Sequence, residues 1–187
     1  FTDEYTVYLF EVRDNVPEDY TMERMGDDLA NEIKKLGLKD IYMYGCSMGG
    51  MECIYIAGTY PELVKKVVVA SSACEANKTS DEVVGNWISL AKAGDTHALV
   101  EDMGQRIYSK AVYEASKDTF SAMAEGLTKY SLSRFVNIAN VIPGMDLTKQ
   151  ASSIKCPMLV LGSKGDMVLT GDASNKIAEL TGAELYM

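Results

Sequence analysis

Several features that define other protein classes are scarce in this sequence. Its 187 residues include a single histidine, and no apolar run approaches the ~20 residues that a membrane span needs. Zinc sites draw on histidine and cysteine, and no cluster of His, Asp and Glu has metal-ligand spacing, so we expect neither a metal nor another cofactor. Basic residues are also few, with 18 Lys and Arg against 27 Asp and Glu and a net charge of −9. This balance disfavours nucleic acid and anionic membrane surfaces as partners.

The cysteines form no disulfide pattern. There are four of them, Cys46, Cys53, Cys74 and Cys156, and no two make a CxxC pair. Free, buried thiols are the better interpretation, and such thiols indicate a reducing compartment. We therefore expect a cytoplasmic protein.

Length and composition fit one globular domain with an insertion. Hydrophobic residues make up 47% of the sequence and charged residues 24%, values typical of a folded chain. The sequence begins at Phe1 without an initiator Met, and it ends at Met187 where a strand should begin. We therefore expect an internal fragment of a longer protein.

Strand and helix patterns alternate in the two outer parts of the sequence. An amphipathic helix is expected from an N-cap at Thr21 to a stop at Gly37. The run Val67-Val68-Val69 is typical of a strand that is buried on both faces. The alternation predicts an α/β fold with a mostly parallel sheet flanked by helices. Strands are predicted at residues 7–12, 40–44, 64–70, 158–161 and 185–186, and further helices at 51–57 and 173–180.

The middle of the sequence lacks strand patterns. Four segments, residues 81–93, 95–109, 111–127 and 131–142, have helical patterns, and glycine or proline separates them. This predicts an all-helical insertion over residues 80–153. The fold core is then divided into residues 1–79 and 154–187.

The run Gly45-Cys46-Ser47-Met48-Gly49-Gly50 lies between a predicted strand and a predicted helix. This is the context that a G-x-S-x-G nucleophile elbow requires, because a sharp turn lifts the serine Oγ above the sheet. Gly45 and Gly49 are expected where side chains would collide with the neighbouring strand and helix. The Met48 N–H, at the start of the helix, would donate to a developing oxyanion. The alternative, a nucleotide-binding turn, fits poorly because its glycine spacing differs.

The elbow, the helix before it, Tyr60-Pro61-Glu62-Leu63-Val64 after it and the late run 154–166 resemble the α/β-hydrolase superfamily. The resemblance covers most of the sequence outside the insertion, which by resemblance is the family's helical cap. Cys46 is expected to be buried between strand and elbow, and therefore unreactive. No HG-type oxyanion motif precedes Val7.

The resemblance also implies a catalytic triad in the order nucleophile, acid, histidine. Ser47 would be the nucleophile, and Asp166, which follows the late strand, would be the acid that orients the histidine. Asp172 is the second candidate for the acid, although a role as N-cap of the following helix suits it better. His97 precedes Asp166 and lies in the insertion, so we expect a surface or cap residue and a catalytic histidine outside this sequence.

The expected activity is hydrolysis of an ester, thioester or related acyl bond of a small molecule, through an acyl-enzyme on Ser47. Two alternatives stay open at this point. An acyltransferase would use the same fold with an alcohol or thiol in place of water. A noncatalytic binder of small molecules would keep the fold without the chemistry.

Overall fold

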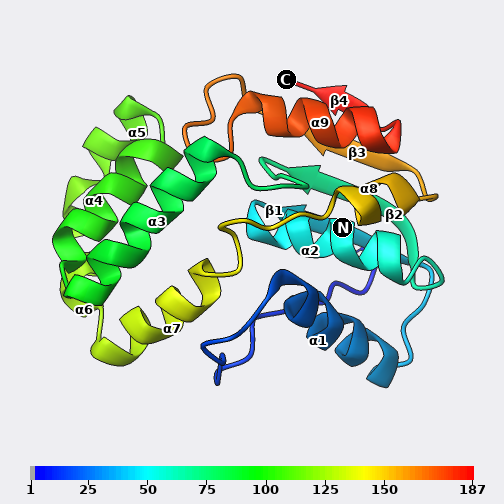
Figure 1. The fold of residues 1–187 in the computed structure, drawn as a ribbon, viewed down its shortest axis with the longest axis horizontal. Helices are drawn as coiled ribbons and strands as arrows, with labels where there is room; N and C mark the ends of the chain where they lie inside the picture. The colour runs from blue at the N-terminus through cyan, green and yellow to red at the C-terminus, as the bar shows by residue number, and fades with distance from the viewer. Residues whose placement is uncertain (1–2) are drawn as a thin grey trace.

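The computed structural model describes residues 3–187, in which a parallel sheet carries helices on one face and a group of helices at one end (Figure 1). The sheet order is β1-β2-β3-β4, and every neighbouring pair is parallel. The strands are β1 (Ile41–Cys46), β2 (Val64–Ala70), β3 (Met158–Leu161) and β4 (Glu184–Tyr186). The predicted α/β class is confirmed.

Four helices pack in sequence along one face of this sheet. They are α1 (Met22–Lys35), α2 (Met48–Thr59), α8 (Thr148–Ser153) and α9 (Gly171–Thr181). Helix α1 contacts α2, α2 contacts α8, and α8 contacts α9. Helix α1 begins as expected, because the Thr21 side chain accepts a hydrogen bond from the Arg24 N–H at 3.3 Å. It is followed by Gly37 at φ +68°, a conformation that suits glycine.

The other face of the sheet is more open, which corrects the expectation of burial on both faces. Val67, Val69 and Val160 point toward the helices and are almost completely buried. Tyr42 and Tyr44, on the opposite face of β1, are 50% and 68% exposed. Successive side chains of a strand point to opposite faces, so the alternation follows directly from cover on one side.

The strand predicted at residues 7–12 is not formed. Val7, Tyr8 and Leu9 are exposed and belong to no strand or helix. The sequence pattern there suits a strand, but a strand also needs a neighbour to complete its hydrogen bonds. Among residues 3–187, no strand pairs with this segment.

Between β2 and β3, five helices gather to one side of the sheet (Figure 1). These helices have a hydrophobic core of their own, in which Trp87 and Leu99 are buried. The predicted third helix is divided in two at Ser116. The helices are α3 (Lys78–Ala93), α4 (Thr96–Ile107), α5 (Lys110–Ala115), α6 (Lys117–Gly126) and α7 (Lys129–Ala139).

Helix α8 lies inside the predicted insertion 80–153 but outside its four predicted helices, and it packs on α2 and α9 of the fold core. No helix within residues 3–187 has both the length and the apolar character to cross a membrane.

Candidate active site

The elbow forms at the carboxyl end of β1, where Ser47 alone separates the strand from α2. Ser47 has φ 52° and ψ −121°, a region that residues with a side chain rarely occupy. Backbone hydrogen bonds hold it there, and two of them are short. The Ser47 N–H donates to the Ala70 carbonyl at 2.9 Å, and the Gly50 N–H donates to the Ser47 carbonyl at 2.9 Å. Ser47 is exposed at the carboxyl end of β1.

Two glycines of the elbow have no room for a side chain. A Cβ on Gly45 would lie 2.2 Å from the Gly49 carbonyl oxygen, and a Cβ on Gly50 would lie 2.5 Å from the Ser72 Oγ. A Cβ on Gly49 would meet nothing within 4 Å among residues 3–187. The expected collision at Gly49 is therefore wrong. Gly50, which lies outside the G-x-S-x-G pattern, is the second glycine that the packing requires.

The Met48 N–H begins helix α2 and lies next to the nucleophile. The first N–H groups of a helix have no partner within the helix. No oxygen among residues 3–187 accepts a hydrogen bond from Met48 N. This N–H and the positive end of the helix are therefore free to stabilise negative charge near Ser47.

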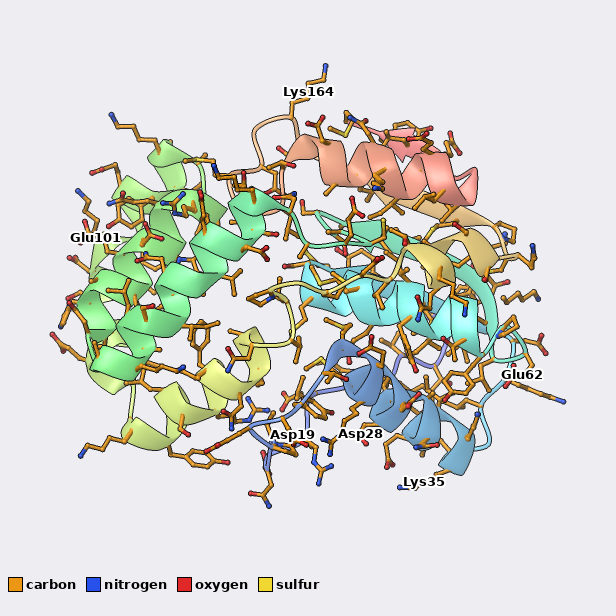
Figure 2. The ribbon with its side chains drawn as sticks, in the orientation of Figure 1. Asp19, Asp28, Lys35, Glu62, Glu101 and Lys164 are labelled. Carbon is orange, nitrogen blue, oxygen red and sulfur yellow. The ribbon has the colours of Figure 1, made fainter. Side chains whose placement is uncertain are left out.

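Asp166 lies in the loop 162–170, between β3 and α9. Its Oδ1 accepts hydrogen bonds from the Val168 N–H at 2.9 Å and the Leu169 N–H at 2.8 Å, and the side chain is half-buried. These bonds close a turn that fixes the carboxylate to its own loop. Lys164, in the same loop, projects outward from the body of the protein (Figure 2).

Ser47 and the Asp166 loop leave the sheet at the same edge. The Ser47 N–H bonds to the Ala70 carbonyl of β2, and the Ser71 N–H bonds to the Leu161 carbonyl of β3. One strand separates β1 from β3, so the two loops start about 10 Å apart at the usual spacing of neighbouring strands. No hydrogen bond joins Ser47 to Asp166.

The other two candidates lie outside this arrangement. Asp172 is in the first turn of α9, whose N-cap is Thr170, so the expected N-cap role of Asp172 is wrong: the helix begins two residues earlier than its hydrophobic pattern indicated. His97 is exposed in the first turn of α4, as expected for a residue of the insertion.

No group of three or more His, Cys, Asp and Glu side chains within residues 3–187 is arranged to hold a metal ion. Burial raises the pKa of the Cys53 thiol to about 12 and that of Cys74 to about 11, so both stay protonated near neutral pH. Cys46 is exposed, which corrects the expectation of burial, because it lies on the open face of β1 with Tyr44.

Sequence reasoning missed one residue that contacts the elbow. Ser72 follows β2, is 1% exposed, and donates a hydrogen bond from Oγ to the Ser47 carbonyl at 2.8 Å. The available signal was the pair Ser71-Ser72 directly after a buried strand, at the edge where the elbow lies.

Comparison with known proteins agrees with this geometry. A family model described as the alpha/beta hydrolase fold matches residues 10–186. The chain is 26% identical over 180 residues to "Putative carbamate hydrolase RutD" of Rhizobium rhizogenes, covering 92% of this chain and 67% of that protein. It is 21% identical over 178 residues to "3-oxoadipate enol-lactonase 2" of Acinetobacter baylyi, covering 91% of this chain and 65% of that protein.

A solved structure gives the same result for the fold. MGS-M2, an alpha/beta hydrolase enzyme from a Medee basin deep-sea metagenome library, superposes with a TM-score of 0.81 at 25% identity, covering 89% of this chain and 63% of that one. The chain thus spans about two thirds of the length of these relatives. With its strained serine between a parallel strand and a helix, this chain belongs to the alpha/beta hydrolase fold family.

Proposed function

We propose that the protein is a serine hydrolase that cleaves an ester, thioester or related acyl bond of a small molecule through an acyl-enzyme on Ser47. The observation that carries the proposal is the exposed serine at φ 52°, held at the start of α2 beside a free Met48 N–H. The relatives named above as a carbamate hydrolase and an enol-lactonase support hydrolysis as the class of reaction.

In the proposed reaction, the Ser47 Oγ attacks the carbonyl carbon of the substrate and its proton passes to a base. The carbonyl oxygen becomes an oxyanion, which accepts a hydrogen bond from the Met48 N–H. The oxyanion then collapses, the bond to the alcohol or thiol breaks, and this leaving group takes the proton from the base, so that the acyl group stays on Ser47. Water, which gives a proton to the same base, next attacks the acyl-enzyme, and the acid is released as the Ser47 Oγ takes that proton back. Asp166, at the same edge of the sheet, would orient the base and stabilise its charged form.

We assign the base to a histidine outside residues 1–187. His97 is the only histidine of the chain, and it is exposed on α4 in the insertion. Loss of a general base costs on the order of a hundred- to ten-thousandfold in rate. A collapse of that size in a His97→Ala variant would make His97 the base instead.

The insertion is proposed to act as a cap over this edge. Asn77, the N-cap of α3, donates from Nδ2 to the Leu169 carbonyl at 3.0 Å and so ties the start of the insertion to the loop of Asp166. We further propose a cytoplasmic location, which the absence of disulfides among the four cysteines supports.

The test is Ser47→Ala in the natural polypeptide that contains these residues. Turnover of a series of p-nitrophenyl esters should fall by about four to six orders of magnitude in kcat. A fluorophosphonate should label the unsubstituted protein at Ser47. The control variant Ser89→Ala, which removes an exposed hydroxyl from α3, should keep both ester turnover and labelling. Unchanged ester turnover in Ser47→Ala would refute the proposal.

The same experiment separates the alternatives. A noncatalytic binder would not react with the fluorophosphonate. An acyltransferase would label but would form product only when an alcohol or thiol acceptor is added.

A further inference from the structure

The strongest unassigned feature of the molecule is the contact between Ser72 and the back of the elbow. Ser72 is one of the few polar side chains that are fully buried, at 1% exposed. Its Oγ lies 2.8 Å from the Ser47 carbonyl oxygen and donates a hydrogen bond to it. Burying a hydroxyl is costly unless it is bonded, so this single contact determines where the side chain rests.

The Ser47 carbonyl belongs to the same peptide unit as the Met48 N–H. A trans peptide is planar, and its C=O and N–H point in opposite directions. Whatever holds the carbonyl therefore also aims the N–H. Three donors hold it: the Ser72 Oγ at 2.8 Å, the Gly50 N–H at 2.9 Å and the Met51 N–H at 3.3 Å.

Of these three donors, only the Ser72 Oγ is a side-chain group, and the other two are backbone N–H groups. The two N–H groups belong to the first turn of α2 and move with the helix that follows the peptide. Ser72 comes from a different element, the end of β2, and so ties the peptide to the neighbouring strand. A hydrogen bond to the carbonyl also polarises the peptide, which makes its N–H a stronger donor.

The chain makes room for this contact at two positions. Ser71 has φ 42°, a rare conformation for a serine, and it turns the chain directly after β2, just before Ser72. Gly50 lies on the other side, where a Cβ would come within 2.5 Å of the Ser72 Oγ and 2.6 Å of its Cβ. Any side chain at position 50 would displace Ser72 from the carbonyl. The strained backbone at Ser71 and the glycine at position 50 therefore serve the same contact.

We propose that Ser72 is a positioning residue for the oxyanion hole: through the Ser47 carbonyl it aims and polarises the Met48 N–H toward the oxyanion. The inference rests on the proposed function, since it requires Ser47 to be the nucleophile. Ser72 itself does not touch the substrate. Its effect should therefore appear in the transition state and not in substrate binding.

The test compares Ser72→Ala with the unsubstituted protein, both made as the natural polypeptide that contains residues 1–187, in the p-nitrophenyl ester assay. One neutral hydrogen bond is lost, so we expect kcat to fall about five- to tenfold, with KM within about twofold of the parent. This loss is smaller than the hundred- to thousandfold cost of removing an oxyanion donor outright. Inhibition by a trifluoromethyl ketone, whose adduct with serine places an oxyanion in the same hole, should weaken by the same factor as kcat.

Two further variants keep the test decisive. Ser72→Cys keeps a side chain of similar size but replaces the hydroxyl by a weak donor, so its kcat should fall as much as that of Ser72→Ala. This variant tests the role of Ser72 if the alanine variant fails to fold. Ser109→Ala removes the same hydroxyl from the N-cap of α5, far from the elbow, and should leave kcat and inhibition unchanged.

The outcomes are separable from those for the proposed function. If Ser47→Ala is inactive while Ser72→Ala or Ser72→Cys keeps kcat and ketone affinity within twofold of the parent, Ser72 has only a structural role and the inference is wrong. A lowered melting temperature with unchanged kcat leads to the same conclusion. If Ser47→Ala stays active, the proposed function itself fails.

Discussion

The two candidate catalytic side chains, Ser47 and Asp166, lie on two strand–loop–helix units that hold them in place by different contacts. In the β1–α2 unit, Ser47 alone joins strand and helix, and in the β3–α9 unit the connection is the loop 162–170. Each unit places a residue of positive φ directly before its helix, Ser47 at 52° and Thr170 at 71°. Neither residue caps its helix with a side-chain hydrogen bond.

The units differ in what holds the functional group. Ser47 is held from outside, by the close approach of Gly45 and Gly50 to their neighbours and by the hydroxyl of Ser72. Asp166 is held by its own side chain, through two N–H groups of the same loop. A side chain added at Gly45 or Gly50 should therefore disturb the fold, whereas Asp166→Asn, which keeps an oxygen that can accept the loop bonds, should disturb the chemistry alone.

The largest difference is expected for Asp166→Asn. The amide oxygen of asparagine can still accept the bonds from Val168 and Leu169, so the loop should keep its shape. The charge that orients the histidine is lost, so kcat for ester hydrolysis should fall by about three to four orders of magnitude with an unchanged melting temperature.

Asp172→Asn is the matched control, because it removes the same charge from the first turn of α9. It should keep kcat within about threefold of the parent, since only its interaction with the helix dipole weakens. If Asp172→Asn shows the large loss and Asp166→Asn does not, the acid has been assigned to the wrong residue.

A smaller effect, on stability, is expected at the two adjacent glycines of the elbow. In Gly50→Ala, the new Cβ would overlap the Ser72 side chain, and overpacking of this kind costs about 1–3 kcal/mol in the free energy of unfolding. Gly49→Ala adds a Cβ in open space within a helix, so it should be neutral or stabilise by up to about 1 kcal/mol. Urea denaturation of both variants measures the difference. Equal losses in the two would mean that Gly49 is also closely packed in the whole protein.

The elbow glycines also show which features of the site a local sequence pattern predicts and which it does not. The elbow was predictable because strand, turn and helix each have a local signal, and β1, β2, β3 and β4 all form where their patterns indicated. Which glycine is crowded was not predictable from the motif. Crowding at Gly50 comes from Ser72, a residue of the next strand–loop unit.

The errors share a physical cause. Residues 7–12 have the pattern of a strand, but strand formation depends on a partner, and no strand pairs with them within residues 3–187. Cys46 is exposed because, within residues 3–187, β1 lies at the edge of the sheet with one open face, which its own sequence does not encode. The division of the third predicted helix at Ser116 likewise depends on packing inside the insertion.

The smallest predicted effect is the pH dependence of the free energy of unfolding that arises from Glu52, in the β1–α2 unit. Glu52, one turn into α2, is half-buried, and no side chain among residues 3–187 donates a hydrogen bond to it. Burial raises its pKa from the usual 4.5 to about 7. The β3–α9 unit is different, because its Lys176 pairs with Glu75.

The sign of the effect follows from linkage. Between pH 4.5 and 7 the folded protein holds a proton on Glu52 that the unfolded chain releases, so the contribution of Glu52 to stability is full below pH 4.5 and is lost as pH rises through 7. In Glu52→Gln this loss disappears. Between pH 5 and pH 8, the free energy of unfolding of the parent should fall by about 1–3 kcal/mol more than that of the variant, measured by urea denaturation at both values. If the free energy of unfolding changes equally with pH in the two proteins, the pKa of Glu52 is not raised, and its carboxylate is solvated or paired in the whole protein.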